Sequence, residues 1–462
     1  MLPRSTRSCR LATVSFLLGA LCLGLPAPVV AEQPAVLETA EASAPRPAPL
    51  EQRWNLHGQV TGIWQGYGRI RSPYEGDNSL PGGGQGKETV SVTPFLGVRL
   101  WQGGEFYFNP EAFQGFGLAR THGLGGFSNG EAQKGGSLSI KPYVARAFVR
   151  QAFGFGGESE QVADEINQLA GMRDVSRATL TVGRFSVTDL FDQNSYAHDS
   201  REGFLNYSIW EGGAFDYAAD QRGYSGGAAI DFNQKMWAFR TGYFLVPIKS
   251  NAQTLSWDLA NRGQVLSELE LRYALMQQPG ILRLLGWQQQ VFAGNYSQAT
   301  RDPDFDPEGS IAETRRVRTQ LGYVINLEQA ITDQLGLFSR YSWRDARSEI
   351  MSWTDIDRSF SLGLSLKGAS WGRPHDTIGL AGALNTLSKS HQQFSALGGL
   401  GVTIGDGRLS YSGEKVHETY YQFNIGKGHQ YLMFDYQLIG NPAYNTDRGP
   451  VSLFAMRVHS EF

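Results

Sequence analysis

The sequence has very little cysteine: only Cys9 and Cys22 occur among its 462 residues. Both lie in an N-terminal segment that carries three arginines, continues with the apolar run 11–25 and ends in small residues before Glu32. This pattern predicts a secretory signal peptide over residues 1–31, because the apolar run is too short to span a bilayer. The chain that follows has no thiol for a disulfide bond, a metal site or a nucleophile.

Long apolar runs and an excess of positive charge are also missing. No stretch of 18 apolar residues follows the signal segment, which excludes a transmembrane helix. The formal net charge is -3 for the whole chain and -6 without residues 1–31, which hold three arginines and no acid. This balance argues against a nucleic-acid partner. Residues 32–53 are rich in proline and alanine and predict a flexible periplasmic linker, followed by a single domain over 54–462.

What the chain does have is a repeated alternation of apolar and polar residues. Every second residue from Leu269 to Leu275 is apolar, whereas Glu268, Glu270 and Arg272 are charged. A period of two predicts a β-strand with one apolar face. Sixteen segments with this pattern lie near 54–67, 88–101, 105–117, 140–155, 178–186, 223–233, 236–247, 266–276, 281–297, 315–327, 334–346, 358–368, 376–386, 414–426, 428–439 and 450–462.

The connections between these segments alternate in length. Tight turns such as 102–104 and 277–280 are followed by long connections such as 187–222. An even number of strands, short periplasmic turns and long extracellular loops are typical of outer-membrane barrels. The sequence therefore predicts an all-β fold, a transmembrane antiparallel β-barrel of sixteen strands, in preference to a soluble β-sandwich. Residues 156–177 are the exception: they form a long connection on the turn side, and their pattern is helix-like.

The alternation also predicts which charged side chains point into the barrel. A sixteen-stranded barrel is wide enough for an aqueous channel. Rings of Arg or Lys indicate an anion pore and rings of acids a cation pore, so mixed charges fit a neutral polyol that donates and accepts hydrogen bonds. The alternative, that these residues only pair across the wall, stays open. The candidate lumen-facing charges are Arg99, Arg146, Arg150, Arg240, Glu268, Glu270, Arg272, Arg316, Arg318, Arg340, Glu414 and Glu418.

Three stretches carry a family resemblance. They are GRFSVTDLFDQNSYAHDSREGFLNYSIWEGGAFDYAADQRGY from Gly183, GDGRLSYSGEKVHETYYQF, and the C-terminal YQLIGNPAYNTDRGPVSLFAMRVHSEF. In this order they closely resemble the carbohydrate-selective outer-membrane porin family, often called OprB-type. The resemblance covers residues 54–462 and implies a sixteen-stranded barrel in a Gram-negative outer membrane. It also implies facilitated diffusion of sugars, with glucose as a typical solute.

The connection 187–222 is the longest of the extracellular connections, and its apolar and polar residues do not alternate with a regular period. Long structured loops are usually functional, so we expect it to fold partly into the pore as a constriction. Its aromatic residues Phe204, Tyr207, Trp210 and Phe215 would offer apolar faces to a pyranose ring. The alternative, that its polar groups only bond each other and the barrel wall, stays open. The candidate constriction residues are Arg184, Asp189, Asp192, Asn194, His198, Asp199, Asn206, Trp210, Asp216, Asp220 and Arg222.

Other interpretations predict other chemistry. An exopolysaccharide exporter would favour a wider lumen with one sign of charge. A barrel-embedded lipid hydrolase would need His198 and Asp199 to meet Ser195 or Ser200 in a defined geometry. We expect no enzyme activity, no cofactor and no metal. The expected partners are carbohydrate solutes, outer-membrane lipid and, through the terminal strand ending in Phe462, the outer-membrane assembly machinery; the oligomeric state stays open.

Overall fold

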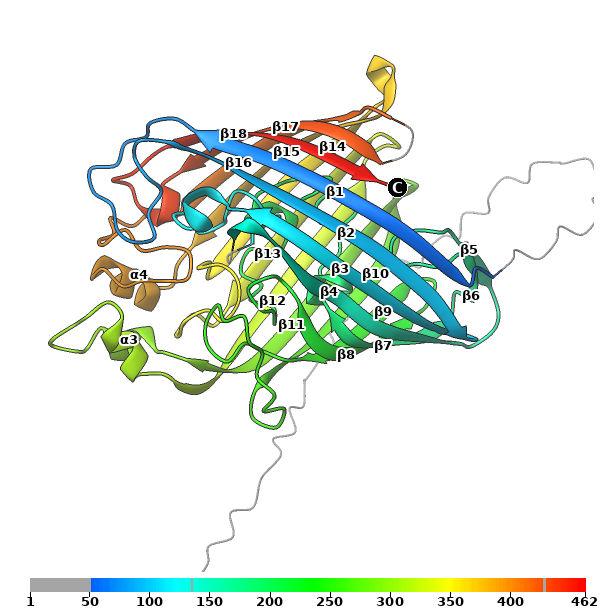
Figure 1. Cartoon of the computed structure of the whole chain (residues 1–462), viewed down its shortest axis with the longest axis horizontal. Helices are drawn as coiled ribbons and strands as arrows, with labels where there is room; N and C mark the ends of the chain where they lie inside the picture. The colour runs from blue at the N-terminus through cyan, green and yellow to red at the C-terminus, as the bar shows by residue number, and fades with distance from the viewer. Residues whose placement is uncertain (1–50, 134–135, 427–428) are drawn as a thin grey trace, which may run out of the picture. The chain divides into compact units, whose positions relative to one another are not determined.

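The computed structural model describes residues 51–133, 136–426 and 429–462. The expected signal peptide, residues 1–31, and nearly all of the linker 32–53 lie outside this part of the chain. The described residues form a closed antiparallel β-barrel (Figure 1). Neighbours along the chain are neighbours in the barrel, and β1 pairs with β18 to close it.

Sixteen strands of the described chain make up the barrel, and each matches one of the sixteen predicted segments, so the predicted fold is confirmed. The strands are β1 (Trp54–Tyr67), β2 (Gln85–Trp101), β3 (Gly104–Gly115), β4 (Ser137–Gly154), β7 (Arg177–Phe185), β8 (Ser225–Asn233), β9 (Trp237–Phe244), β10 (Gly263–Leu275), β11 (Gln278–Ala293), β12 (Arg316–Ala330), β13 (Leu335–Arg344), β14 (Arg358–Gly368), β15 (Arg373–Thr386), β16 (Glu414–Asn424), β17 (Gln430–Gly440) and β18 (Val451–Glu461).

Side-chain exposure follows the alternation that predicted these strands. In β18, Phe454 and Met456 are exposed on the outer face, whereas Arg457 and His459 are buried inside. Outward apolar side chains meet lipid, and inward polar ones meet the contents of the barrel. Exposed aromatic residues lie at the strand ends on the turn side of the barrel, as in the aromatic girdles of membrane barrels: Trp54, Trp101, Phe153 and Trp237.

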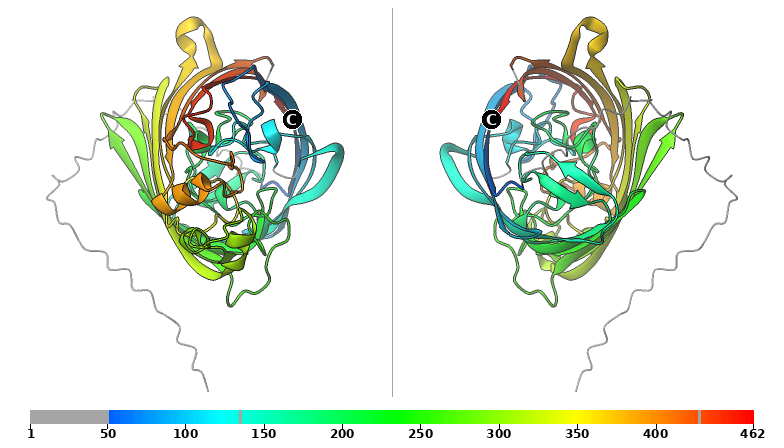
Figure 2. Two further views of the ribbon diagram at one scale, coloured as in Figure 1. Left: turned by 90° about the vertical axis from the view of Figure 1, so that its left-hand side faces the viewer. Right: turned by 90° about the vertical axis from the view of Figure 1, so that its right-hand side faces the viewer.

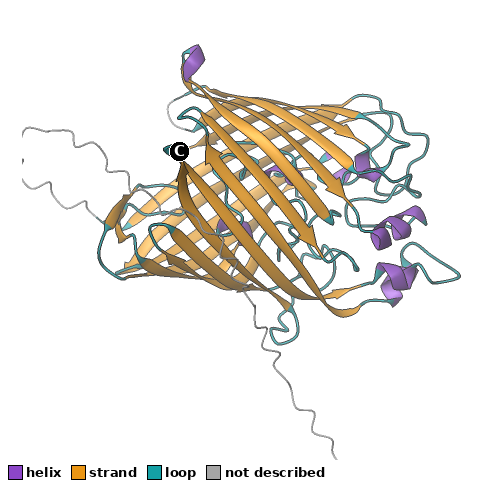
Figure 3. Cartoon of the chain, turned by 180° about the vertical axis from the view of Figure 1, so that it is seen from behind, coloured by secondary structure: helices purple, strands orange, loops and turns teal. Residues whose placement is uncertain are grey.

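The two ends of the barrel differ in the length of their connections. At the turn end, β2 and β3 are joined by residues 102–103 and β10 and β11 by 276–277. At the long-loop end, the connections include 68–84, 186–224 and 387–413. Figure 3 shows the loops with most of the helices at one end and the narrow turns at the other. The predicted alternation of short turns and long loops is therefore confirmed.

The helix-like interpretation of residues 156–177 is wrong. They contain β5 (Ser159–Val162) and β6 (Gly171–Asp174), which pair as a separate antiparallel hairpin at the turn end. Glu160 lies opposite Arg173 in this register, and their side chains form an ion pair of 2.8 Å. Asn55 of β1 donates to the carbonyls of Glu165 and Gln168 and holds the hairpin tip. Contacts with a distant strand thus outweigh local helix propensity.

Helical segments are short and lie in the connections. They are α1 (Tyr207–Trp210), α2 (Tyr296–Ala299), α3 (Gly309–Glu313), α4 (Lys389–Ala396) and the 3-10 turns η1 (Leu118–Arg120), η2 (Val187–Asp189), η3 (Ala369–Trp371) and η4 (Pro442–Tyr444). Among the described residues, no helix is long and apolar enough to cross a membrane.

The connection 186–224, here called the pore loop, lies inside the barrel. The two end-on views in Figure 2 show segments of the chain that lie within the ring of strands. Its Phe191 and Tyr217 pack in one buried cluster with Phe244 and Trp287 of the wall. Phe204, Tyr207 and Phe215 are almost completely buried in such clusters. The expectation that these three rings face a sugar is therefore wrong: they fasten the loop to the wall by burying apolar surface.

Candidate pore constriction

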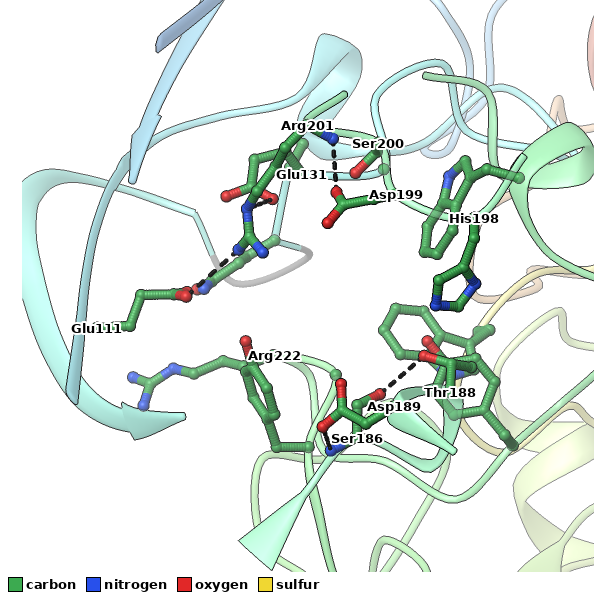
Figure 4. Close-up of a pocket in the computed structure, with 18 of the residues that line it drawn as sticks. Glu111, Glu131, Ser186, Thr188, Asp189, His198, Asp199, Ser200, Arg201 and Arg222 are labelled. Atoms are coloured by element: carbon green, nitrogen blue, oxygen red, sulfur yellow. Dashed lines mark hydrogen bonds and ion pairs between the residues drawn. The ribbon is translucent and has the colours of Figure 1, made fainter. Parts of the chain in front are cut away.

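The pore loop borders a small cavity inside the barrel. The cavity has a volume of about 140 Å³ and is also bordered by β3, β4, residues 130–133 and Trp353. Figure 4 shows His198, Asp199 and Arg201 on one side of it and Ser186, Thr188 and Asp189 on another. We call it the constriction cavity, because it is much smaller than two other spaces bordered by the barrel and its loops.

At the turn end, a vestibule of about 960 Å³ is bordered by β4, β7 and the β5–β6 hairpin. It shares Arg146, Asp189 and His198 with the constriction cavity, so these three residues separate the two spaces. At the long-loop end, a second vestibule of about 750 Å³ is bordered by the connections that carry Asn78, Ser250 and α3. The constriction cavity is therefore the smallest of these three spaces.

The boundary between the cavity and the turn-end vestibule is an ion pair. Arg146 of β4 donates from Nε and Nη2 to the two carboxylate oxygens of Asp189, at 2.7 and 2.6 Å. A bidentate pair fixes both side chains in one orientation. Asp189 also accepts from the backbone N–H of Ser186 at 3.0 Å, which completes a capping box around η2. The first turn of the pore loop is thus locked to the wall at the constriction.

A second group of charges lies on the opposite side, around Arg201. Its guanidinium lies 3.0 Å from Glu131 and 3.4 Å from Glu111. Its backbone N–H donates to Asp199 at 2.7 Å. Burial disfavours the charged guanidinium, but the three carboxylates outweigh burial and raise the pKa of Arg201 well above its ordinary value. Arg201 therefore stays charged, and its charge is balanced by its neighbours.

Cations in the cavity also lie over aromatic rings. The guanidinium of Arg222 lies 4.3 Å from the ring centre of Tyr143, and that of Arg146 lies 5.2 Å from the ring centre of Tyr224. Such contacts hold a planar cation flat against an aromatic face. The cavity thus presents Arg146, Arg201 and Arg222 against four acids, Glu111, Glu131, Asp189 and Asp199, with neither sign in large excess.

His198 Nδ1 and Trp210 Nε1 are buried at the cavity, and neither atom has a hydrogen-bond partner among the described residues. The amide of Gln193 donates to the carbonyl of Thr188, which orients its nitrogen, and this nitrogen lies 3.0 Å from His198 Nε2. His198 Nε2 must then accept, which places the ring proton on Nδ1. Burial, followed by the charge of Arg340, lowers the pKa of His198. Both free nitrogens are therefore N–H donors.

Other polar residues of the pore loop turn away from the cavity and bond to the wall. Asp192 accepts from Asn326 at 2.6 Å, from Arg340 at 3.1 Å and from the backbone N–H of Gly212 at 2.7 Å. Asp192 is completely buried. Buried charge is tolerated only when it is paired and hydrogen-bonded in this way. Asp192 is thus a brace that holds two parts of the pore loop against β12 and β13.

Asp216 is a second brace. Its carboxylate accepts from three successive backbone N–H groups, those of Met351, Ser352 and Trp353, at 2.6 to 3.1 Å. Gln289 of β11 donates to it at 3.1 Å. A carboxylate with this many donors ties the pore loop to the connection 345–357 as well as to the wall.

Two asparagines and an ion pair complete the set of braces. Asn194 donates to Asn326 at 2.8 Å. Asn206 caps α1 by accepting from the N–H of Ser208 and donates to Gln437 of β17 at 3.2 Å. Arg184 of β7 donates to Asp220 at 2.6 Å. Of the predicted constriction residues, the cavity is lined by Asp189, His198, Asp199, Trp210 and Arg222. The remainder lie outside its lining: Arg184, Asp192, Asn194, Asn206, Asp216 and Asp220.

The predicted lumen charges divide in the same way. Five of them line the turn-end vestibule: Arg99, Arg146, Arg150, Arg240 and Arg272. Five others are buried and bond to wall or loop groups: Glu268, Glu270, Arg340, Glu414 and Glu418. The last two, Arg316 and Arg318, lie at the long-loop end of β12.

The buried carboxylates of the wall have a common role. Glu418 accepts from the backbone N–H groups of Leu205 and Asn206 at 2.5 and 2.9 Å. Glu268 accepts from the N–H of Asp192 at 2.8 Å and pairs with Arg240 at 2.9 Å. A connection folded into a barrel cannot satisfy all its own backbone donors, so wall carboxylates supply the acceptors.

Several residues of the cavity were missed from the sequence. Arg201 lies in the same aperiodic run as Asp199 but was not singled out, and Tyr217 and Tyr224 follow in the same loop. A signal was available for them, because every polar or aromatic residue of an aperiodic connection is a candidate. Glu131 carries no such signal: it lies in a different connection, and only the folded chain brings it to Arg201.

Comparisons with known proteins agree with the barrel fold. The model of the carbohydrate-selective porin, OprB family, matches residues 78–462. No curated protein matches significantly. The high pH structure of Pseudomonas putida OprB aligns with a TM-score of 0.67 and 15% identity over 89% of this chain and 94% of that chain. This likeness supports the fold.

Two further alignments are weaker. The low pH structure of Pseudomonas putida OprB aligns at a TM-score of 0.48 and 12% identity over 89% of this chain and 93% of that chain. The outer membrane channel DcaP of Acinetobacter baumannii aligns with a TM-score of 0.48 and 9% identity over 88% of this chain and 97% of that chain.

Proposed function

The chain belongs to the OprB family of carbohydrate-selective porins, and from this premise we propose that neutral monosaccharides such as glucose diffuse through its constriction cavity. The family and the barrel fold make the protein a carbohydrate channel of the Gram-negative outer membrane. No covalent bond is made or broken in this process. The solute moves down its concentration gradient from one vestibule to the other, through the space beside Arg146, Asp189 and His198.

The observation that carries this proposal is the pair of unpartnered donors, His198 Nδ1 and Trp210 Nε1, beside the carboxylates of Asp189 and Asp199. A sugar hydroxyl both donates and accepts, so it can accept from these N–H groups and donate to the carboxylates. The solute then exchanges hydrogen bonds with water for hydrogen bonds with the cavity, at little net cost. The indole of Trp210 also offers an apolar face to a pyranose ring.

The charges of the cavity favour a neutral solute over an ion. Arg146 and Arg201 are each neutralised by carboxylates at 3.4 Å or less. A pore that selects anions needs cationic groups whose charge is not already compensated. A cavity with paired charges keeps strong local dipoles but little net field, which suits hydroxyl groups.

The two other interpretations fit the geometry less well. An exopolysaccharide exporter needs a wide bore, whereas the constriction cavity is about 140 Å³. A lipid hydrolase needs a serine bonded to a base. Ser195 Oγ donates to Glu328 at 3.3 Å, and within the described chain no hydrogen bond joins His198 to Ser195 or Ser200. We therefore expect transport without catalysis.

The outer surface supports two further expectations about partners. The exposed apolar faces of the strands, such as Phe454 and Met456 of β18, are expected to contact outer-membrane lipid. Phe462 exchanges two backbone hydrogen bonds with Gly58 of β1, at 2.8 and 3.0 Å, and its side chain is exposed. We expect the assembly machinery to recognise this last strand before the barrel closes.

Liposome swelling tests the proposal. Liposomes containing the purified protein should swell faster in glucose than in a zwitterionic amino acid of similar size. Protein-free liposomes and liposomes with a general porin are the controls. Equal rates for glucose and the amino acid would overturn sugar selectivity.

A further inference from the structure

A second cluster of chemically active side chains lies at the turn end, outside the constriction cavity. It brings together Glu202 from the tip of the pore loop, His429 from the turn before β17 and Glu461 from the end of β18. One donor atom from each residue lies within 4.8 Å of the other two. The turn end of β18, near the label C in Figure 1, marks the position. Three segments that are distant in sequence therefore meet at one point.

The distances in this cluster match those between ligands of a small cation. His429 Nδ1 lies 3.2 Å from Glu202 Oε1 and 3.7 Å from Glu461 Oε2. Zinc–ligand bonds of about 2.0–2.2 Å place neighbouring ligand atoms of a tetrahedron roughly 3.3–3.6 Å apart. The two distances from His429 are close to this range, and the ligand atoms of Glu202 and Glu461 lie within 4.8 Å of each other.

A fourth side chain faces the same carboxylates from inside the barrel. His459 Nε2 lies 3.3 Å from Glu461 Oε1 and 3.8 Å from Glu202 Oε1. Its other nitrogen, Nδ1, is hydrogen-bonded to Thr61 of β1 at 2.8 Å. A ring anchored at one nitrogen holds its second nitrogen in a fixed direction, as in the outer contacts of metal sites. His459 thus positions the carboxylates.

We propose that Glu202, His429 and Glu461 form a binding site for Zn²⁺ or a similar first-row transition-metal ion, with His459 as its positioning residue. Imidazole nitrogen together with carboxylate oxygen is a ligand set that suits zinc, whereas Mg²⁺ and Ca²⁺ prefer oxygen ligands alone. The two carboxylates balance the charge of the ion. His429 and Glu202 are partly exposed, so an ion can enter from the turn end.

The site would tie the pore loop to the seam of the barrel. Glu202 directly follows Arg201, which lines the constriction cavity, and Glu461 lies on β18, the strand that closes the barrel against β1. An ion at this point links the tip of the pore loop to two elements of the wall.

Isothermal titration of the purified protein in detergent with ZnCl₂ tests this proposal. The wild-type protein should bind one Zn²⁺, and His429→Gln and Glu202→Gln should each weaken binding by at least about ten-fold. The matched control is His57→Gln, because His57 also lies at the turn end but, among the residues that the structure describes, pairs with a single carboxylate, that of Asp164, at 2.9 Å. This variant should bind Zn²⁺ like the wild type.

Two further measurements test which ion binds and which residue is its ligand. Titration with MgCl₂ should show much weaker binding than ZnCl₂, and Co²⁺ should give the intense visible absorption of a low-symmetry, nitrogen-ligated ion in the wild type but not in His429→Gln. Absence of saturable Zn²⁺ binding would overturn the proposal. Equal losses in His57→Gln and His429→Gln, or equal binding of Mg²⁺ and Zn²⁺, would overturn it as well.

Discussion

Asp192 and Asp199 lie seven positions apart in the same loop and have the same chemistry, yet they have opposite surroundings. Asp192 is completely buried and bonded to Arg340 and Asn326 of the wall. Asp199 lines the constriction cavity and accepts from the backbone of Arg201. The difference shows that the pore loop contains two classes of residue: braces, which set its position, and lining residues, which border the constriction cavity.

The comparison also explains why the loop can be polar and still lie inside a barrel. Each brace supplies hydrogen-bond partners that the folded loop and the wall would otherwise lack, as Asp216 does for three successive N–H groups of the connection 345–357. Lining residues keep some hydrogen-bonding capacity unused, as His198 and Trp210 do. Satisfied groups fix the loop, and the function proposed above assigns the unsatisfied groups to the sugar.

The largest effect is expected from removing a brace. Asp192→Ala leaves the buried guanidinium of Arg340 without its carboxylate, which costs about 3–5 kcal/mol of stability. The pore loop should leave its position, so single-channel conductance should rise and discrimination between glucose and amino acids should fall. Bilayer recordings and thermal unfolding in detergent measure both effects. Asp199→Asn is the matched control and should lower stability little; unchanged conductance in Asp192→Ala would show that Asp192 is not a brace.

A smaller effect is expected from acidification. Because burial lowers the pKa of His198 below its ordinary value of 6.5, the ring is neutral at pH 7. As the pH falls, His198 is protonated in the unfolded chain at a higher pH than in the folded chain. The free energy of unfolding is therefore highest above pH 6.5 and decreases as the pH falls below this value. Protonation also places an N–H of Nε2 against the amide of Gln193.

Sugar affinity, measured by block of ion current, should therefore stay constant between pH 8 and about 6.5 and fall at lower pH. The variant His198→Gln should lose this dependence. A transition centred above pH 6.5 would contradict the assigned state of the ring.

A modest effect is expected at the lining residue Trp210. Trp210→Phe keeps an aromatic face but removes the unpartnered N–H. One hydrogen bond contributes about 1 kcal/mol, which corresponds to roughly five-fold weaker sugar binding with little change in stability. Sugar-dependent block of single-channel current gives the affinity. Unchanged affinity would mean that the sugar does not use Trp210 Nε1.

The smallest effect is expected at Arg316, a predicted lumen charge that is exposed at the long-loop end of β12. Arg316→Gln should change stability by less than about 0.5 kcal/mol and leave glucose-driven swelling of liposomes unchanged. A strong loss of swelling would extend the functional lining from the constriction cavity to the long-loop end.

The fold was predictable from the sequence, because a period of two follows directly from the pleat of a strand with lipid on one side. The β5–β6 hairpin was not predictable, since it depends on the contacts of Asn55 with residues more than a hundred positions away. Local propensity favours a helix in this segment, but pairing between β5 and β6 makes it a hairpin.

The candidate site was predictable as a segment but not residue by residue. The absence of a period marked the pore loop, and its placement in the barrel followed from its length. Whether an aspartate holds the pore loop against the wall or borders the cavity depends on its partners. Partners such as Arg340 and Met351 are distant in sequence. No pattern within the loop distinguishes Asp192 from Asp199.

The most direct test of this division is a crystal structure of the protein with glucose. The account predicts a sugar in the constriction cavity, within hydrogen-bond distance of His198 Nδ1 and Trp210 Nε1, with Asp192 and Asp216 still bonded to the wall. A sugar bound only in a vestibule, or one that contacts Asp192 or Asp216, would contradict the division of the pore loop into braces and lining residues.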